Sequence, residues 1–409
     1  MQQPQSPWLD DGSSRIPSAV YTSEAIYREE LDKIFYGPHW SYVGLAIEVP
    51  DAGSFKRTSI GERSVIMIRN RKGEINVLEN RCAHRGMRFC QERTGKVKTL
   101  VCPYHQWNYN YEGKLLGVPF QRGVKGNGGM PADFSLDDHG LTRLKVAVRN
   151  GVVFACFDQA VEDIEDYLGP DILACFDRTF SGRELVLHGY SRQRIPGNWK
   201  LMMENIKDPY HPGLLHTWFV TFGLWRADNQ SQLKLDRLGR HAAMLSKRPE
   251  KVTANVEEGV SSYRSNMQLH DMRLLDIVHE DWWGEHTVCM MTVFPNVIFQ
   301  QQVNSLSTRQ IIPAGPGSFD FVWTHFGFAD DDPAMVERRL RQANLFGPAG
   351  FVSADDGEVI EFSQDGFEQD ADFSTLCELG GTDVASAEHG VTETLIRGMY
   401  RYWRKVMNQ

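Results

Sequence analysis

Residues 82–110, CAHRGMRFCQERTGKVKTLVCPYHQWNYN, contain two short Cys-His pairs, Cys82 with His84 and Cys102 with His105. Around them, strand-like runs such as SVIMIRN (64–70) and GVVFACF (151–157) are separated by Gly, Asn and Asp turns. This texture is typical of a small all-β domain. Two loops that each carry a Cys-His pair can close over a metal centre from opposite sides, so the stretch predicts a β domain built around a metal site.

The four side chains are the ligand set of a Rieske [2Fe-2S] cluster, in which two thiolates hold one iron and two imidazoles hold the other. Zinc is the alternative, because two Cys and two His also make a tetrahedral structural site. The spacings C-x-H and C-x-x-H depart from the usual zinc-finger spacing, which favours the cluster.

Charge and cysteine content narrow the class of protein. The 44 basic and 53 acidic side chains give a net charge of −9, which disfavours nucleic acid or an anionic membrane as the main partner. The first residues lack the basic start and apolar run of a secretory signal, and no apolar stretch long enough to span a membrane occurs. Seven scattered cysteines are better explained by reduced thiols and metal ligation than by disulfides. We therefore expect a cytoplasmic protein.

At 409 residues the chain exceeds what one hydrophobic core usually serves. We expect an N-terminal arm and helix over 1–40, the β domain over 41–158 and a second domain over 159–409. Runs such as 286–313 and 318–328 indicate long antiparallel strands, and 392–407 indicates a terminal helix. The second domain is therefore predicted to be α+β with a large antiparallel sheet.

A second constellation lies in ENIKDPYHPGLLH, residues 204–216. On a regular helix His211 and His216, five positions apart, would point about 140° away from each other, and Pro212 and Gly213 supply the distortion that lets them share a metal. Asp208 is near enough in sequence to hydrogen-bond His211. Alone, these residues are equally compatible with a half-buried helix and a helix cap.

Two His and one carboxylate form the facial triad of non-haem Fe(II) sites, which leaves positions open for oxygen and substrate. The best source of the carboxylate is the pair Asp355-Asp356 in GPAGFVSADDGEVIEF, residues 347–362. On the residues alone either acid qualifies, and the pair is also compatible with a solvated turn.

The stretch 82–110 closely resembles the Rieske signature of aromatic ring-hydroxylating oxygenases, and the resemblance continues through 198–229, 344–361 and the terminal helix. It implies that the chain is a large (alpha) subunit with a catalytic domain of helix-grip type. It also implies that Asp356, the second acid of its pair, completes the iron triad with His211 and His216.

The resemblance implies partners as well. Electrons from NADH are expected to arrive through a separate reductase and a ferredoxin. In related enzymes the cluster of one subunit serves the iron of its neighbour, which would make Asp208 the bridge from His105 of the adjacent chain to His211. An α3 trimer, or an α3β3 assembly with a small beta subunit, follows.

The expected substrate is an aromatic carboxylic acid, and the expected reaction with O2 is hydroxylation of salicylate at the carbon para to its hydroxyl, giving gentisate. The alternatives are dioxygenation of benzoate-, anthranilate- or terephthalate-like acids to cis-dihydrodiols, and a non-catalytic Rieske electron-transfer or zinc-binding protein. A buried carboxylate needs a cationic partner. Arg309 and Arg397 are the candidates, with Gln302 and Asn304 as weaker ones, although a structural salt bridge explains each arginine equally well.

Overall fold

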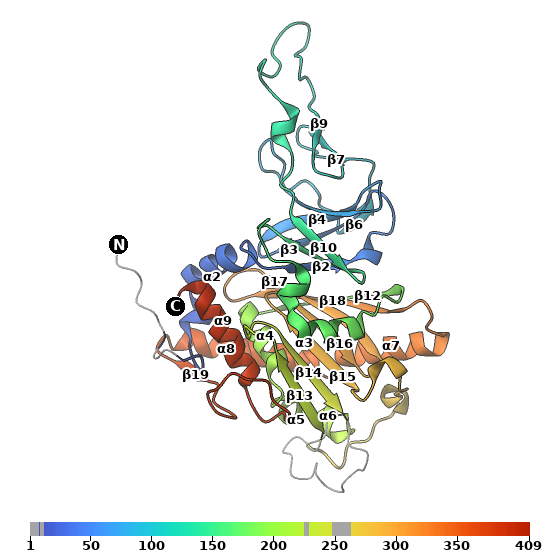
Figure 1. Cartoon of the computed structure of the whole chain (residues 1–409), viewed down its shortest axis with the longest axis vertical. Helices are drawn as coiled ribbons and strands as arrows, with labels where there is room; N and C mark the ends of the chain where they lie inside the picture. The colour runs from blue at the N-terminus through green and yellow to red at the C-terminus, as the bar shows by residue number, and fades with distance from the viewer. Residues whose placement is uncertain (1–7, 9–11, 225–228, 248–262) are drawn as a thin grey trace. The chain divides into compact units, whose positions relative to one another are not determined.

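A computed structural model describes residues 8, 12–224, 229–247 and 263–409 (Figure 1). The chain forms two compact units: a small unit, Phe35–Asp163, and a large unit that joins Met1–Ile34 to Ile164–Gln409. Parts of the expected N-terminal arm (1–7 and 9–11) and of the motif stretch (225–228) lie outside the described residues. The limits 1–40, 41–158 and 159–409 remain our proposal for the functional domains.

The small unit is built from antiparallel strands in three sheets, as the alternation of strand-like runs and turns predicts. The first sheet has the order β5 (Ile75–Glu79), β4 (Arg63–Arg69), β3 (Ser54–Ile60), β6 (Thr94–Lys96). The second is β10 (Lys145–Arg149), β11 (Val152–Cys156), β2 (Ser41–Leu45), and the third is β7 (Leu100–Val101), β8 (Asn108–Tyr109), β9 (Leu115–Gly117).

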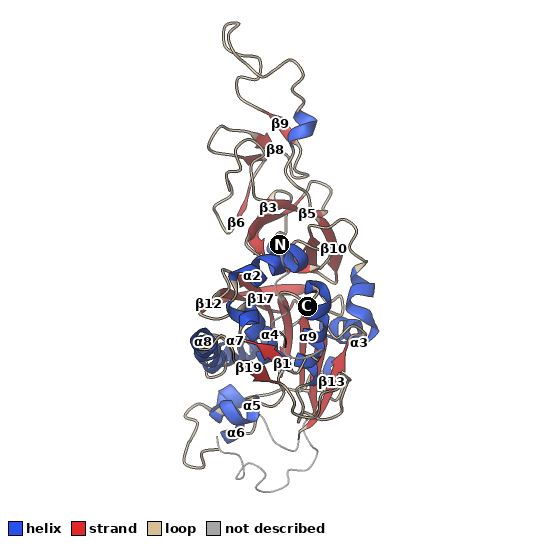
Figure 2. Ribbon diagram, turned by 90° about the vertical axis from the view of Figure 1, so that its left-hand side faces the viewer, coloured by secondary structure: helices blue, strands red, loops and turns tan. Residues whose placement is uncertain are grey.

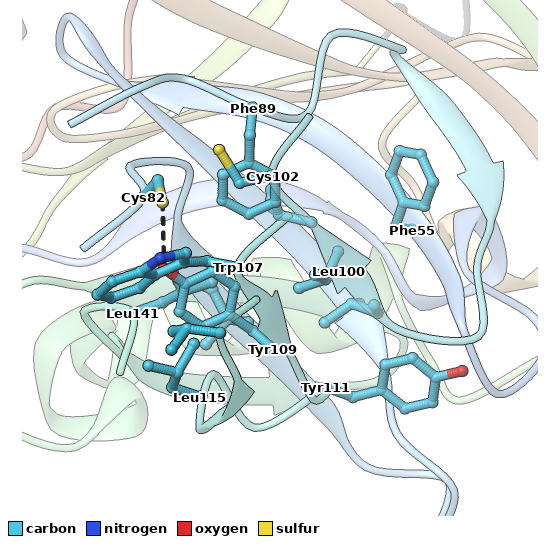
Figure 3. Packing of buried hydrophobic residues seen from close by; sticks show 14 residues of the cluster. Phe55, Cys82, Phe89, Leu100, Cys102, Trp107, Tyr109, Tyr111, Leu115 and Leu141 are labelled. Atoms are coloured by element: carbon cyan, nitrogen blue, oxygen red, sulfur yellow. Dashed lines mark hydrogen bonds between the residues drawn. The ribbon is translucent and has the colours of Figure 1, made fainter. Parts of the chain in front are cut away.

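One core of the small unit packs residues of the first sheet, such as Ile66 and Leu78, against Cys82, Cys102 and Tyr109 of the Cys-His stretch. Hydrophobic burial therefore holds the two Cys-His loops against the β scaffold. Figure 3 shows that Trp107, Tyr109 and Leu115 continue this core beside Cys82.

The large unit is organised by one antiparallel sheet of seven strands. Its order is β12 (Leu185–Ile195), β18 (Phe319–Phe328), β17 (Ser305–Pro313), β16 (Val297–Gln302), β15 (Val288–Val293), β14 (Ala242–Lys247), β13 (Gln230–Leu235). A short pair, β1 (Arg15–Pro17) and β19 (Ser374–Leu376), lies apart from it. The α+β organisation predicted from the long apolar runs is confirmed.

Helices cover both faces of this sheet; Figure 2 shows α3 and α8 on opposite sides. The helices are α1 (Ala19–Thr22), α2 (Glu24–Glu30), α3 (Ile164–Thr179), α4 (Trp199–Lys207), α5 (Pro212–Leu215), α6 (Thr217–Thr221), α7 (Pro333–Phe346), α8 (Ser353–Gln369) and α9 (Thr394–Met407). No helix among the described residues is long and apolar enough to cross a membrane.

Side-chain alternation along the strands assigns each face to its helices. Phe176 of α3 packs edge-on against Phe299 of β16. On the opposite face, Lys207 at the end of α4 donates to the hydroxyl of Thr292 at 2.7 Å, and Ser353 of α8 donates to the side-chain oxygen of Gln193 at 2.8 Å. We call this second face, against which α4 and α8 pack, the α4 face.

A buried carboxylate anchors the N-terminal helix α2 to the rest of the large unit. Glu30, at the end of α2, accepts hydrogen bonds from the indoles of Trp199 and Trp403 at 2.8 and 2.7 Å. It also pairs with the buried Lys200 ammonium at 2.7 Å. Because α4 begins with Trp199 and Lys200, this network fixes the start of the helix that leads to the His211 segment.

Candidate metal centres and active site

The two Cys-His loops have the same backbone construction. In the first, the Cys82 N–H donates to the Met87 carbonyl and the Gly86 N–H donates to the Cys82 carbonyl. In the second, the Cys102 and Gln106 N–H groups make the equivalent bonds with Trp107 and Cys102. Gly86 has a φ of 70° and Gln106 a φ of 58°, so each loop turns through a left-handed residue at the same position. Two matching loops therefore present Cys and His side by side.

The side chains of the loops meet in like pairs. The thiol of Cys102 interacts with that of Cys82, and both cysteines are buried. The rings of His84 and His105 lie edge to face with their centroids 4.5 Å apart. Nδ1 of His84 is buried and has no hydrogen-bond partner among the described residues. A thiol pair beside an imidazole pair with an unpartnered nitrogen fits the ligation of a metal centre by these four side chains.

This pairing fits a two-iron cluster better than a single zinc ion. A zinc site gathers its four ligand atoms around one point, whereas a Rieske cluster takes two thiolates on one iron and two imidazoles on the other. In the described part of the chain, the one group of ligand atoms that gathers within 4.8 Å of one another lies elsewhere, at His211, His216 and Asp356.

The hydroxyl of Tyr109 lies within hydrogen-bond distance of one cysteine of the candidate cluster site. Tyr109 Oη lies 3.2 Å from Cys82 Sγ and accepts a hydrogen bond from the Ala83 N–H at 3.1 Å (Figure 3). Burial, followed by the hydrogen bond to Cys82, raises the pKa of Tyr109 well above its usual range. The phenol therefore stays protonated and donates to the sulfur whenever Cys82 is a thiolate.

The His211 segment breaks its helix where proline and glycine predict. α4 ends at Lys207, α5 begins at Pro212 directly after His211, and His216 stands between α5 and α6. The two imidazoles, with centroids 5.4 Å apart, can therefore face the same point.

Asp356, in the first turn of α8, supplies the point at which both rings converge. Its Oδ1 lies 3.6 Å from His211 Nε2 and 3.2 Å from His216 Nε2. Asp356 and His216 are buried, and His211 is partly buried. Two imidazole nitrogens and one carboxylate within 4.8 Å of one another fit a facial triad for one metal ion.

Each histidine of this group is backed by a second acid. His211 Nδ1 lies 3.3 Å from Asp208 Oδ2, and His216 Nδ1 lies 3.2 Å from Asp355 Oδ2. A carboxylate behind an imidazole keeps the proton on Nδ1 and leaves Nε2 free for a metal. Asp355, one of the two candidates for the triad carboxylate, therefore lies behind His216 instead of between the rings.

The acids also set the protonation of the group. Burial opposes a charge on His211, but the carboxylates of Asp208 and Asp356 outweigh it and raise the pKa of His211 to about 9. Burial likewise opposes a charge on Asp356, yet hydrogen bonds from His211 and His216 hold its pKa well below the ordinary value. Without metal, a proton shared among these side chains compensates the buried carboxylate.

Arg309 of β17 points from the α4 face toward this group. It is 3% exposed, its guanidinium lies 3.9 Å from the centre of the Trp323 ring, and it interacts with the Asp356 charge. Its NH2 group donates to Gln300, and its Nε has no partner among the described residues. Burial lowers the pKa of Arg309 to about 9, so the site holds a desolvated cation.

The other predicted substrate residues lie in different surroundings. Arg397 donates to the carbonyls of Asp383, Cys377 and Leu379 at 2.9 to 3.1 Å, so its guanidinium holds a loop. Asn304 exchanges two hydrogen bonds with the Val278 backbone and donates to Glu280. Gln302 accepts a hydrogen bond from Gln300 on the α4 face, and Gln300 in turn accepts one from Arg309.

Several residues that contact the site were not predicted from the sequence. Asn205 donates to Asp356 Oδ1 at 3.2 Å, and Ser307 donates to Gln300 Oε1 at 3.1 Å. Asn205 could have been found from its place in α4 six residues before His211. Gln300 and Ser307 required the pairing of β16 with β17.

Comparison with known families gives two matches. Residues 178–409 match the family described as "Ring hydroxylating alpha subunit (catalytic domain)". Residues 39–127 match the "Rieske [2Fe-2S] domain".

Curated relatives match over nearly the whole chain. The chain is 64% identical to the large oxygenase component of salicylate 5-hydroxylase from Ralstonia sp, covering 99% of this chain and 97% of that protein. It is 39% identical to the terminal oxygenase component subunit alpha 2 of terephthalate 1,2-dioxygenase from Comamonas sp, covering 100% and 99%. It is also 39% identical to the anthranilate 1,2-dioxygenase large subunit of Burkholderia cepacia, covering 97% and 94%.

Among solved structures, a naphthalene 1,2-dioxygenase with indole bound in its active site superimposes with a TM-score of 0.79. The match covers 98% of this chain and 94% of that chain at 23% sequence identity, and it shows a common fold.

Proposed function

The chain belongs to the family of ring-hydroxylating oxygenase alpha subunits and contains its Rieske [2Fe-2S] domain, and on that premise we propose that it hydroxylates salicylate at the carbon para to the hydroxyl, giving gentisate. The 64% identity to a salicylate 5-hydroxylase component supports this substrate. The geometric observation that carries the proposal is Arg309, a buried cation beside the triad with an unpartnered Nε.

We assign the cofactors to residues as follows. Cys82, His84, Cys102 and His105 hold the cluster, and His211, His216 and Asp356 hold the mononuclear iron. When bound, the two centres supply single electrons and activate O2 beside the substrate. The reaction consumes two electrons from NADH; one oxygen atom enters the ring and the other leaves as water.

The protein's own side chains prepare the site for this chemistry. Asp355 keeps the proton on Nδ1 of His216, Asp208 places a carboxylate 3.3 Å from Nδ1 of His211, and Asn205 donates a hydrogen bond to Asp356. Arg309 neutralises the substrate carboxylate, because an unpaired charge in a buried site is costly. Gln302 and its neighbour Gln300 supply polar contacts on the same face.

We propose the same electron route as in the family. A separate reductase and a ferredoxin deliver electrons to the cluster, and Asp208 connects His105 of the adjacent chain to His211. An α3 or α3β3 assembly, the latter with a small beta subunit, is therefore part of the mechanism. The seven free cysteines suit a reducing compartment, and we propose a cytoplasmic location.

Product analysis tests the proposal. The purified protein with reductase, ferredoxin, NADH and salicylate is expected to give gentisate, with one atom of oxygen from labelled O2. Product with both oxygen atoms and two added hydrogens would support the second candidate, a cis-dihydrodiol-forming dioxygenase. That candidate is favoured by the 39% identity to terephthalate and anthranilate dioxygenase subunits.

A further inference from the structure

The α4 face carries more unpartnered polar atoms than Arg309 alone. Trp323, paired with Arg309 across β17 and β18, is 1% exposed, and its indole Nε1 has no partner among the described residues. His325, two positions further along β18, is 7% exposed, and its Nδ1 also lacks a partner there. Buried polar atoms without hydrogen bonds are unfavourable, so a row of three indicates a polar ligand on this face.

The three residues form one stack on the α4 face, and Arg309 is the member of the stack that interacts with the triad. The Arg309 guanidinium interacts with Asp356 and stacks on the Trp323 ring. The Trp323 and His325 rings are stacked in turn, with centroids 5.8 Å apart. The stack therefore offers a ligand a cation that interacts with the triad carboxylate and an imidazole separated from that cation by the Trp323 ring.

The imidazole is held in one orientation. Its Nε2 lies 3.0 Å from the hydroxyl of Ser191, which is paired with Trp323 across β12 and β18. Burial, then the charges of Arg309 and His188, lowers the pKa of His325 to about 4. The ring is therefore neutral at neutral pH, and Nδ1 donates or accepts one hydrogen bond according to the tautomer that Ser191 selects.

The geometry of the substrate matches this stack. When the ring carbon to be hydroxylated is held at the triad, the carboxylate of salicylate is meta to it and the hydroxyl is para. The hydroxyl is therefore the substituent farther from the reacting carbon. A side chain that recognises it has to lie beyond the one that binds the carboxylate.

We propose that His325, oriented by Ser191, binds the ring hydroxyl of a 2-hydroxybenzoate through Nδ1 and thereby selects hydroxylated over unsubstituted benzoates. A phenol both donates and accepts, so it complements either tautomer. The inference rests on the proposed function, since it assumes that Arg309 binds the carboxylate. It makes His325 a specificity residue and leaves the metal ligands unchanged.

Two substitutions separate the two nitrogens of the ring. The amide of His325→Gln reaches the position of Nε2 and can keep the contact with Ser191, but it leaves the hydroxyl without a partner. The shorter amide of His325→Asn places a polar atom near Nδ1. His188→Gln is the matched control, because it makes the same change at a neighbouring histidine outside the row.

The test measures dissociation constants of salicylate and benzoate by calorimetry, using the metal-loaded complete oxygenase without oxygen. The wild type is expected to bind salicylate about tenfold more tightly than benzoate, the value of one buried hydrogen bond. His325→Gln is expected to lose this ratio while its benzoate affinity and cluster spectrum stay unchanged, which verifies folding. His325→Asn is expected to retain most of the ratio, and His188→Gln all of it.

Two results would overturn the inference, and they differ in what they say of the function. If the wild type prefers salicylate and His325→Gln keeps that preference, the hydroxyl is recognised elsewhere and the proposed function stands. If the wild type binds salicylate and benzoate equally, the site does not recognise the ring hydroxyl, and His325 is not a specificity residue. Failure to form gentisate in the product analysis counts against the proposed function itself.

Discussion

The two proposed metal centres of this chain differ in how far apart in sequence their side chains lie and in the charges that surround them. The proposed cluster site takes its four side chains from two matching loops within residues 82–107, and its thiols and imidazoles meet in pairs. The triad joins segments about 140 residues apart, and second acids stand behind both of its histidines. Ion pairs connect the buried side chains of the triad, whereas the four side chains of the proposed cluster site offer one another only thiols and imidazoles. The local site should therefore depend on its metal for folding more than the dispersed one does.

The largest expected effect is at the cluster. Cys102→Ala is expected to remove the cluster and all NADH-dependent turnover, and to lower the melting temperature of the small unit, because Cys102 lies in its core. Visible absorption, sulfide analysis and calorimetry measure these changes. Cys156→Ala is the control, since it removes another buried thiol of the same unit and should leave the colour intact. A coloured Cys102→Ala protein would contradict the assignment.

At the triad the loss of turnover should be equally complete but the fold should be retained. Asp356→Ala removes the carboxylate on which His211 and His216 converge, so the mononuclear iron is lost while the cluster spectrum persists. Iron analysis and electron paramagnetic resonance of the reduced cluster separate the two centres. Asp365→Ala, on the exposed side of the same helix, should behave as wild type.

The difference between a site that is local in sequence and one assembled from distant segments also explains which site residues could be predicted from the sequence. Cys82, His84, Cys102 and His105 are close in sequence, so their spacing alone predicted a metal site. His211 and His216 were predicted from a helix-breaking proline and glycine, which the structure places between them. The choice of Asp356 over Asp355 needed family resemblance, because adjacent residues of a helix point in different directions and only the fold shows which one meets both rings.

The substrate residues were the hardest to predict, for a related reason. Arg309, Arg397 and Asn304 are all buried polar residues in the large unit, and burial does not distinguish a ligand-binding side chain from one that holds a loop. The distinction depends on partners: the carbonyls around Arg397 come from residues 377–383, which precede it in sequence by fourteen or more positions. Strand register, which places Arg309 opposite Trp323, is equally non-local.

Next in size is the effect of the acid behind His211. Asp208→Asn keeps the shape of the side chain but removes its charge, and loss of such a partner typically lowers metal affinity or activity by about 10- to 100-fold. Asp355→Asn makes the same change behind His216. If Asp208 also bridges to the adjacent chain, its variant alone should slow oxidation of the reduced cluster in a single turnover at full iron loading. Equal rates for the two variants would reduce Asp208 to an orienting residue.

A pH-dependent effect is expected in the large unit. Burial raises the pKa of Glu204 from 4.5 to about 7, although hydrogen bonds from Tyr400 and Tyr21 oppose the rise. The folded state therefore favours the protonated acid. Its contribution to stability is complete below pH 4.5 and is lost as pH rises through 7, a difference of about 3 kcal/mol.

Glu204→Gln replaces the protonated acid by a neutral side chain of similar shape. It is expected to unfold less readily than the wild type at pH 8 by up to about 3 kcal/mol, and to match it near pH 4.5. Denaturant unfolding of the large unit at both pH values measures the difference. An equal effect of the substitution at both pH values would show that folding does not raise the pKa of Glu204.

The smallest effect tests the single hydroxyl that supports the cluster site. Tyr109→Phe removes the hydrogen bond to Cys82 Sγ and leaves the ring in the core. A hydrogen bond stabilises the sulfur more strongly when the reduced cluster carries the extra electron, so its loss should lower the reduction potential. One hydrogen bond of ordinary strength corresponds to roughly 20 to 60 mV for one electron.

Tyr111→Phe is the matched control, because that hydroxyl donates to the Val97 carbonyl at 2.7 Å and not to a sulfur. Protein-film voltammetry of the three proteins should shift for Tyr109→Phe alone. Equal reduction potentials in the three proteins would mean that the Tyr109 hydroxyl does not tune the cluster, and that groups farther from the sulfur determine its potential.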